Sequence, residues 1–283
     1  MLDDIAARVQ ADFARARSWA FLNDILGFLS GRPKRLLSYD EVKEKLRIGG
    51  PIYRGVKTVP ISQIVGSLNR YHEFDAAFLP KNDENANRWQ SVDRAFYQEV
   101  SLPPVVLYKV GEVYFVVDGH HRVSVAREQN ADFIDAEVRE CSTKVKITSG
   151  LKSEDLEILQ DKVEFLEATN LDQLRPGEDI YLTIPDGFSR MLEHIAVHRY
   201  FMGLDEKRDI SEREAVLHWY DTVYLPIIKA IRESGILENF PGKTEGDLYL
   251  WVLDHQEYLN EEEGRDLQPP ASAAWDFIHD TDT

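Results

Sequence analysis

The chain has 283 residues, of which 43% are hydrophobic and 29% charged, and its net charge is −17. This length allows more than one domain with a substantial core. A single cysteine excludes an intramolecular disulfide and a cysteine-rich zinc module, and the longest apolar stretch, residues 19–29, is too short to span a membrane.

The net charge is unevenly spread along the chain. Residues 1–50 hold 9 basic and 7 acidic side chains, residues 51–145 hold 11 and 13, and residues 146–283 hold 13 and 30. DNA binding needs basic side chains that neutralise phosphates, so the acidic C-terminal part disfavours a DNA surface. A loose basic group nearer the N-terminus leaves DNA contact open, although a solvated surface is the simpler interpretation: Arg32, Lys34, Arg35, Lys43, Lys45 and Arg47.

The N-terminal segment, residues 1–50, is expected to be helical. Apolar residues recur at helical spacing over residues 3–29 (Ile5, Val9, Phe13, Leu22, Ile25, Leu26 and Leu29), and Gly31-Arg32-Pro33 ends that helix. Ser38 and Glu41 have the spacing of a capping box and open a short helix through Leu46. The acids Asp3 and Asp4 stand where a signal peptide carries bases, which together with the single cysteine predicts a cytoplasmic protein.

Residues 51–145 are expected to form a small domain with a mixed sheet. Residues 56–65 favour a strand interrupted by Pro60, and residues 91–99 favour a helix. Two apolar runs, residues 105–108 and 113–117, flank a turn at Gly111 and predict a β-hairpin. The second run leads directly into a helix, which a further strand over residues 133–138 follows.

The remainder is expected to be a mainly helical domain, residues 146–260, followed by an acidic tail, residues 261–283. Helices are predicted from residue 153, over 188–202, over 212–234 and over 245–259, with one short strand at 181–184. The fold class is therefore α+β: a mixed-sheet domain flanked by an N-terminal helical segment and a helical C-terminal domain.

The sequence Asp118-Gly119-His120-His121-Arg122 lies where the predicted hairpin enters its helix. Amides at a helix start lack intrahelical acceptors and favour anions, and glycine lets the backbone approach a phosphate. Arg122 offers a planar fork of donors, and the two histidines can donate hydrogen bonds or transfer a proton. Asp118 is able to cap the helix or hold a magnesium ion. A structural turn, with Arg122 paired to a surface acid, is the simpler alternative.

This pattern resembles the second sequence box of the ParB/sulfiredoxin superfamily. ParB proteins carry G-E-R-R here, sulfiredoxin carries G-C-H-R, and the ParB-like free-serine kinase carries D-G-H-[TH]-R, the form most similar to this chain. Residues 59–64, Val-Pro-Ile-Ser-Gln-Ile, resemble the first box, I-P-x-x-x-I. The resemblance implies that nucleotide phosphates (ATP, ADP or CTP) contact Gly119, His120, His121 and Arg122, and that Asp118 binds magnesium. Ser124, in the same helix, is also expected to bind the nucleotide.

Departures from the family pattern narrow the expected activity. His120 replaces both the reactive cysteine of sulfiredoxin and the acid of ParB, and Cys141 lies outside the motif. The arginine that ends the first box in ParB proteins has no counterpart in register here, and Arg70 is near but offset. The motif does not identify a kinase base; Glu73 and Asp75, downstream of the first box, are the candidates.

We therefore expect a nucleotide-binding protein whose catalytic candidates for phosphoryl transfer or hydrolysis are Asp118, His120 and His121. The alternatives are a ParB-type DNA-binding partition regulator and a non-catalytic protein switched by nucleotide; a homo-oligomer is compatible with each.

The helical C-terminal part offers a second, weaker pattern. Four histidines fall on predicted helices and allow a metal site between facing helices: His194, His198, His218 and His255. Aromatic residues are interleaved with them, so a helical core with hydrogen-bonded histidines is the favoured interpretation. The sequence 240–244 ends like a P-loop but lacks its first glycine and preceding strand.

Overall fold

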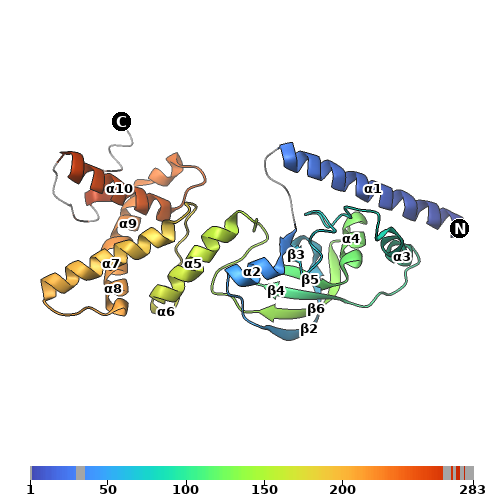
Figure 1. Cartoon of the computed structure of the whole chain (residues 1–283), viewed down its shortest axis with the longest axis horizontal. Coiled ribbons are helices and arrows are strands. Elements are labelled where there is room, and N and C mark those ends of the chain that lie inside the picture. Colours follow the sequence, from blue (N-terminus) through green and yellow to red (C-terminus); the bar gives the residue numbers. More distant parts are fainter. Residues whose placement is uncertain (1, 30–35, 264–268, 270–271, 275–276, 278–283) are drawn as a thin grey trace. The chain divides into compact units, whose positions relative to one another are not determined.

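The computed structural model describes residues 2–29, 36–263, 269, 272–274 and 277 (Figure 1). The chain divides into two compact units, Met1–Leu156 and Glu157–Thr283, each described by itself below. In its described part, the first unit holds a six-stranded mixed sheet with four α-helices, and the second unit is helical. The class is α+β, as the sequence predicts. The N-terminal helical segment and the sheet belong to one unit.

The sheet has the order β1-β3-β5-β4-β6-β2. Its strands are β1 (Leu37–Ser38), β2 (Pro51–Pro60), β3 (Ile64–Ser67), β4 (Val105–Val110), β5 (Val113–Asp118) and β6 (Phe133–Cys141). The predicted hairpin is confirmed, because β4 and β5 pair antiparallel and close at Gly111, whose φ is +60°. Strand β5 also pairs parallel with β3, so the C-terminal ends of these two strands lie at the same edge.

Pro60 divides the region that the sequence favours as one strand. Strand β2 begins earlier than predicted, at Pro51, and ends at Pro60, which has no amide hydrogen to continue the ladder. A 3-10 turn, η1 (Ile61–Gln63), follows, and β3 then starts on the other side of the sheet order. The two halves of the predicted strand therefore form separate strands, β2 at one edge of the sheet and β3 next to the opposite edge.

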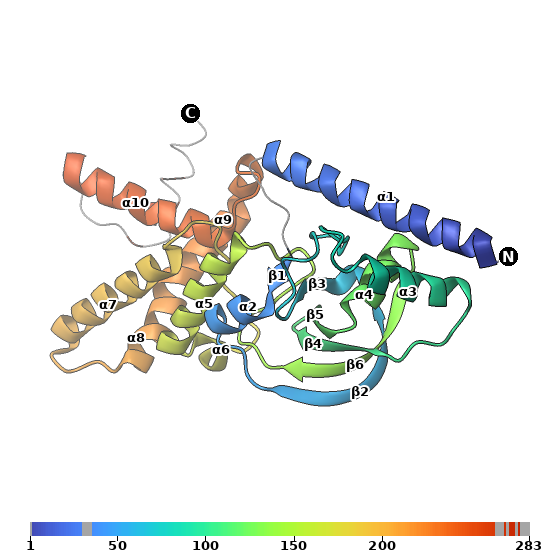
Figure 2. The same ribbon diagram turned by 45° about the vertical axis from the view of Figure 1, so that its right-hand side comes forward.

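The helices of the first unit are α1 (Leu2–Leu29), α2 (Tyr39–Lys45), α3 (Ala86–Tyr97) and α4 (His120–Glu128). Ser38 caps α2 by accepting a hydrogen bond from the amide of Glu41, which confirms the capping box. Figures 1 and 2 show α1 lying alongside α3 and α4. The aromatic centre of this packing is Trp89 on α3, whose ring lies 5.5 Å from that of Phe13 on α1.

The predicted apolar face of α1 is only half correct. Val9 and Phe13 are buried, but Leu22, Ile25 and Leu26 are exposed. In this second half, polar side chains hold the helix to the loop before α3: Asn23 donates to Asp75, and Asp24 pairs with Lys81. These contacts orient the polar side inward, which apolar spacing could not indicate. Gly31-Arg32-Pro33 lies outside the described residues.

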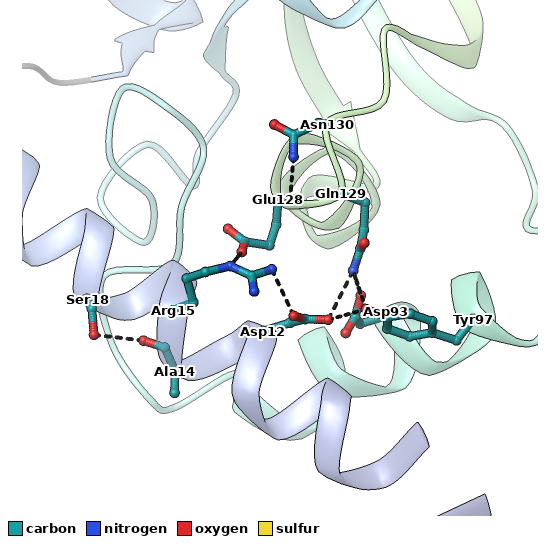
Figure 3. Close-up of polar contacts among 9 residues, drawn as sticks. All are labelled: Asp12, Ala14, Arg15, Ser18, Asp93, Tyr97, Glu128, Gln129 and Asn130. Carbon is teal, nitrogen blue, oxygen red and sulfur yellow. Dashed lines mark hydrogen bonds and ion pairs between the residues drawn. The ribbon is translucent and has the colours of Figure 1, made fainter. Parts of the chain in front are cut away.

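A partly buried polar network also joins α1 and α3 to the C-terminal end of α4 (Figure 3). The Nε2 group of Gln129 donates to Asp93 at 2.8 Å and to Asp12 at 3.2 Å, while the Tyr97 hydroxyl donates to Asp12 at 2.6 Å. Arg15 of α1 bridges Asp12 and Glu128. Three carboxyl groups, those of Asp12, Asp93 and Glu128, thus gather where the helices pack, and the guanidinium of Arg15 pairs with two of them.

The second unit contains six α-helices within the described residues. They are α5 (Asp155–Thr169), α6 (Leu171–Leu174), α7 (Gly187–Glu206), α8 (Glu212–Trp219), α9 (Leu225–Ser234) and α10 (Glu245–Glu263). The predicted helix over 212–234 is interrupted by a π-helical turn, η2 (Tyr220–Tyr224), and a 3-10 turn, η3 (Ile236–Asn239), follows α9.

The strand predicted at 181–184 is wrong. That segment has no strand partner in the described chain, and the amide and hydroxyl of Thr183 bond the carboxylate of Asp247 on α10 instead. The predicted tail, 261–283, lies largely outside the described residues. No helix in the described ranges is long and apolar enough to cross a membrane.

Candidate functional site

The motif at residues 118–122 lies where β5 meets α4, as predicted. Gly119 is the N-cap of α4, with a φ of +95°, and no side chain caps this helix end. The first-turn amides of α4 therefore point away from the helix without an intrahelical acceptor. Because β3 and β5 are parallel, the end of β3 at Ser67 lies beside this helix start.

A pocket of about 230 Å³ opens at the start of α4. Three arginines line it, and they come from three parts of the chain: Arg70 from the loop after β3, Arg88 from α3 and Arg122 from α4. Asp118 is the one acid among its lining residues. The remaining lining residues are Val92, Leu102, Pro103, Gly119, His120 and His121.

His120 is buried and held by neighbouring side chains. Its Nε2 lies 2.7 Å from the hydroxyl oxygen of Ser67, and its ring stacks on Phe74 at 6.2 Å between centroids. Burial, aided by the charge of Arg70, lowers the pKa of His120 to about 4. The imidazole is therefore neutral at physiological pH.

His121 is the most informative residue in the pocket. The residue is only 6% exposed, and its ring packs edge-on against that of Phe74. Neither ring nitrogen has a hydrogen-bond partner in the described chain. Burial and then the charges of Arg70 and Arg88 lower the pKa of His121 to about 4. Leaving two buried polar atoms unpaired is costly, so this geometry points to a ligand or bound water that the pocket receives.

Arg122 is engaged in this structure by protein groups. Its Nη2 donates to Asp118 at 2.6 Å, and its Nη1 donates to the carbonyl oxygens of Pro103 and Pro104. Asp118 itself is 70% exposed. A phosphate at Arg122 therefore competes with Asp118 for the Nη2 group. This ion pair is also what the simpler structural-turn alternative predicts.

Arg88 and Arg70 were not predicted as ligands. Arg88 is exposed, and no partner for its side chain occurs among the described residues. Arg70 donates to both carboxylate oxygens of Glu73, at 2.7 and 2.5 Å, which lowers the pKa of that carboxyl. In the sequence, Arg70 could be noticed only because it lies near the position of the first-box arginine. No sequence pattern pointed to Arg88, which lies on a helix 30 residues before the motif.

The other predicted site residues lie outside the pocket lining. Ser124 is fully buried, and its hydroxyl accepts a hydrogen bond from the Trp89 indole at 2.9 Å. Asp75 is buried and accepts from the amides of Ala77 and Leu79, so it shapes the loop. Glu73 is bound to Arg70 beside the pocket.

The structure assembles no metal cluster in its described part. There, no three side chains of the His, Cys, Asp or Glu type come together to hold a metal ion. His198 hydrogen-bonds His218 at 2.8 Å, and His194 bonds the Tyr249 hydroxyl at 3.2 Å. His194 and His198 are thus hydrogen-bonded to neighbouring side chains, whereas His218 lies at the surface.

The basic group near the N-terminus lies partly outside the described residues, which exclude Arg32, Lys34 and Arg35. Of the remainder, Lys45 pairs with Glu41 on α2. The charge of Lys45 is thus offset by a neighbouring carboxylate of the same helix.

No family model matches the chain, and no curated protein matches it. Among solved structures, the chain is similar to a Pnob8-like ParB-N domain, with 13% identity and a TM-score of 0.21 over 82% of this chain and 83% of that one. The identity and the TM-score are both too low for this similarity to define a family. Fold and site together define an α+β protein with a cation-lined pocket at a glycine-capped helix start.

Proposed function

We propose that the chain is a ParB-like nucleotide-binding protein whose pocket at the start of α4 receives the phosphates of a nucleoside di- or triphosphate. The observation that carries this proposal is His121, which is buried with two unpaired ring nitrogens beside Arg70 and Arg88. A neutral imidazole donates one hydrogen bond and accepts another, so a phosphate oxygen and a water together satisfy it. The uncapped amides of α4 supply further donors.

Charge in the pocket favours an anion. Three guanidinium groups line the pocket. Asp118 pairs with Arg122, and Glu73 beside the pocket pairs with Arg70, so Arg88 is the lining cation that has no described counterion. When phosphate oxygens take the place of Asp118 at Arg122, the carboxylate is released toward solvent. A single exposed carboxylate with phosphate oxygens and water is a usual ligand set for magnesium, which would supply further charge neutralisation.

We extend the proposal to phosphoryl transfer or nucleotide hydrolysis. Arg70 and Arg88 are placed to neutralise charge that develops on a transferred phosphoryl group. The imidazole of His121 is neutral at physiological pH, and a phosphate bound beside it would raise its pKa from about 4 and make it a stronger base for the proton of an attacking hydroxyl. The extension is tested by measuring the release of inorganic phosphate from ATP or CTP in the presence of magnesium. We expect His121→Gln to lose this release while it still binds nucleotide.

Calorimetric titration with ATP, ADP and CTP tests the binding proposal. Arg88→Ala should weaken binding by about tenfold, because a charge-assisted contact to phosphate is removed. Arg94→Ala is the matched control, since Arg94 is exposed on the same helix but does not line the pocket. If the unchanged protein binds none of these nucleotides and no pyrophosphate, the proposal is wrong.

A further inference from the structure

A second cavity adjoins the cation-lined pocket. It has a volume of about 270 Å³ and shares four lining residues with the first: Val92, Leu102, Pro103 and Arg122. Its lining residues come from α3, α4, β6 and the segment that leads into β4. Arg122 forms the common wall, fixed there by its hydrogen bonds to the carbonyl oxygens of Pro103 and Pro104.

The second cavity is lined mainly by apolar side chains. Phe96 on α3 is 47% exposed and Phe133 on β6 is 59% exposed, although both are large apolar residues. Val100 and Leu102, from the segment that joins α3 to β4, are exposed at the same cavity. Large apolar side chains gathered around one hollow on a polar surface mark a place that another apolar group covers.

The two cavities are complementary in chemistry and in size. One is lined by cations and polar donors, and the other is lined by rings and aliphatic groups. Each is smaller than the roughly 300 Å³ at which ligand sites usually begin, whereas the pair reaches that range. A ligand that fills both must carry a strongly anionic end directly beside an apolar-faced end.

We propose that the apolar cavity receives the aromatic base of the nucleotide whose phosphates occupy the cation-lined pocket. The inference rests on the proposed function and adds the part of the ligand that distinguishes a nucleotide from pyrophosphate. Phe96 and Phe133 come from different elements and present exposed ring surface, and aromatic rings stack on bases irrespective of base identity. Arg122 contacts both parts of the ligand.

Calorimetry with inorganic pyrophosphate, ADP, CDP and geranyl diphosphate tests this inference on the full chain. The unchanged protein should bind ADP or CDP about tenfold more tightly than pyrophosphate, because only the nucleotides fill the apolar cavity. In the double variant Phe96→Ala, Phe133→Ala, that advantage should disappear while pyrophosphate affinity is unchanged. Both side chains are about half exposed, so folding should be retained. Tyr53→Ala, which removes an exposed ring on β2 outside the cavity, is the control.

Three results would overturn the inference about the base, and each can be distinguished from a result that rejects the proposed phosphate site. Equal affinity of the unchanged protein for pyrophosphate and both nucleotides would show that the base makes no contact. Full nucleotide affinity in the double variant would place the base elsewhere. Geranyl diphosphate binding more tightly than either nucleotide would assign the cavity to an alkyl chain. Absence of binding by every one of these ligands would instead reject the phosphate site itself.

Discussion

Gly119 connects β5 to α4 in a backbone conformation that L side chains rarely adopt, with a φ of +95°. A Cβ atom there would lie 2.6 Å from Cγ1 of Val105 and 2.9 Å from Nη2 of Arg122. We therefore expect Gly119→Ala to lower the free energy of unfolding by about 1–3 kcal/mol, measured by urea unfolding.

Gly55 offers a matched control for that substitution. Its φ is +87°, but a Cβ atom would meet nothing within 4 Å. Gly55→Ala therefore reports the backbone strain alone and should cost less than Gly119→Ala. Equal losses would mean that crowding by Val105 and Arg122 contributes nothing at the start of α4.

The two buried histidines make stability depend on pH. Their folded-state pKa values of about 4 lie below the ordinary value of 6.5, so the unfolded chain binds more protons between these limits. Stability should fall as the pH is lowered from about 6.5 to about 4, by at most about 3 kcal/mol for each histidine. His121→Gln should reduce this fall in urea unfolding experiments, whereas His72→Gln, at an exposed position, should not.

A steeper dependence in His121→Gln than in the unchanged protein would contradict this account. The same measurement with saturating nucleotide adds a second readout. A phosphate beside His121 favours its protonated form and raises its folded-state pKa toward the ordinary value of 6.5, so the fall in stability should be smaller with bound nucleotide.

The packing of α1 against α3 and α4 depends on the network in Figure 3. Burial and the nearby charge of Asp12 raise the pKa of Asp93 to about 6, and Oδ2 of Asp93 has no hydrogen-bond partner in the described chain. The native state thus holds this proton more tightly than the unfolded chain, whose carboxyl titrates near 3.8. The contribution of Asp93 to stability falls as the pH rises from about 4 to about 6.

Asp93→Asn mimics the protonated carboxyl at every pH. We expect it to raise the free energy of unfolding by about 1–3 kcal/mol at pH 8 and by less at pH 5. The difference between variant and unchanged protein, measured against pH, isolates this group from the histidines. Asp132→Asn, at an exposed position, is the control. Destabilisation at pH 8 would show that the charged form of Asp93 is required.

The local pattern of the sequence predicted the elements that carry the motif. Alternating apolar runs around Gly111 identified the β4–β5 hairpin, and the glycine before a polar helix start located the beginning of α4. The segment at 181–184 has strand-like composition, but a strand exists only with a partner, and Asp247 on a distant helix takes the hydrogen bonds of Thr183 instead. The composition of residues 181–184 could not predict that contact.

The pocket itself was only half predictable, because its wall is assembled from distant parts of the chain. Gly119, His120, His121 and Arg122 are contiguous and could be found by motif. Arg88 and Phe96 reach the two cavities because α3 packs on α4, and Phe133 does so through the sheet order. Whether Arg122 faces a ligand or pairs with Asp118 is decided by side-chain geometry that spacing does not encode.

At the scale of the whole molecule, the two units differ sharply in charge. Residues 157–283 hold 28 acidic and 11 basic side chains, which accounts for the entire net charge of −17, while residues 1–156 hold 22 of each. The lining of both cavities lies within residues 70–135. A tethered unit of this charge repels an approaching anion, and salt screens that repulsion.

A fragment of residues 1–156 should therefore bind nucleotide about two- to fivefold more tightly than the full chain at about 10 mM salt, where the screening length is about 30 Å. Above about 150 mM salt, with a screening length of about 8 Å, the two affinities should converge. Calorimetry with ADP measures the difference, circular dichroism establishes that the fragment is folded, and uncharged adenosine should show no salt-dependent gap. A gap that persists at high salt would contradict a long-range electrostatic origin, because only screened repulsion distinguishes the two proteins in this account.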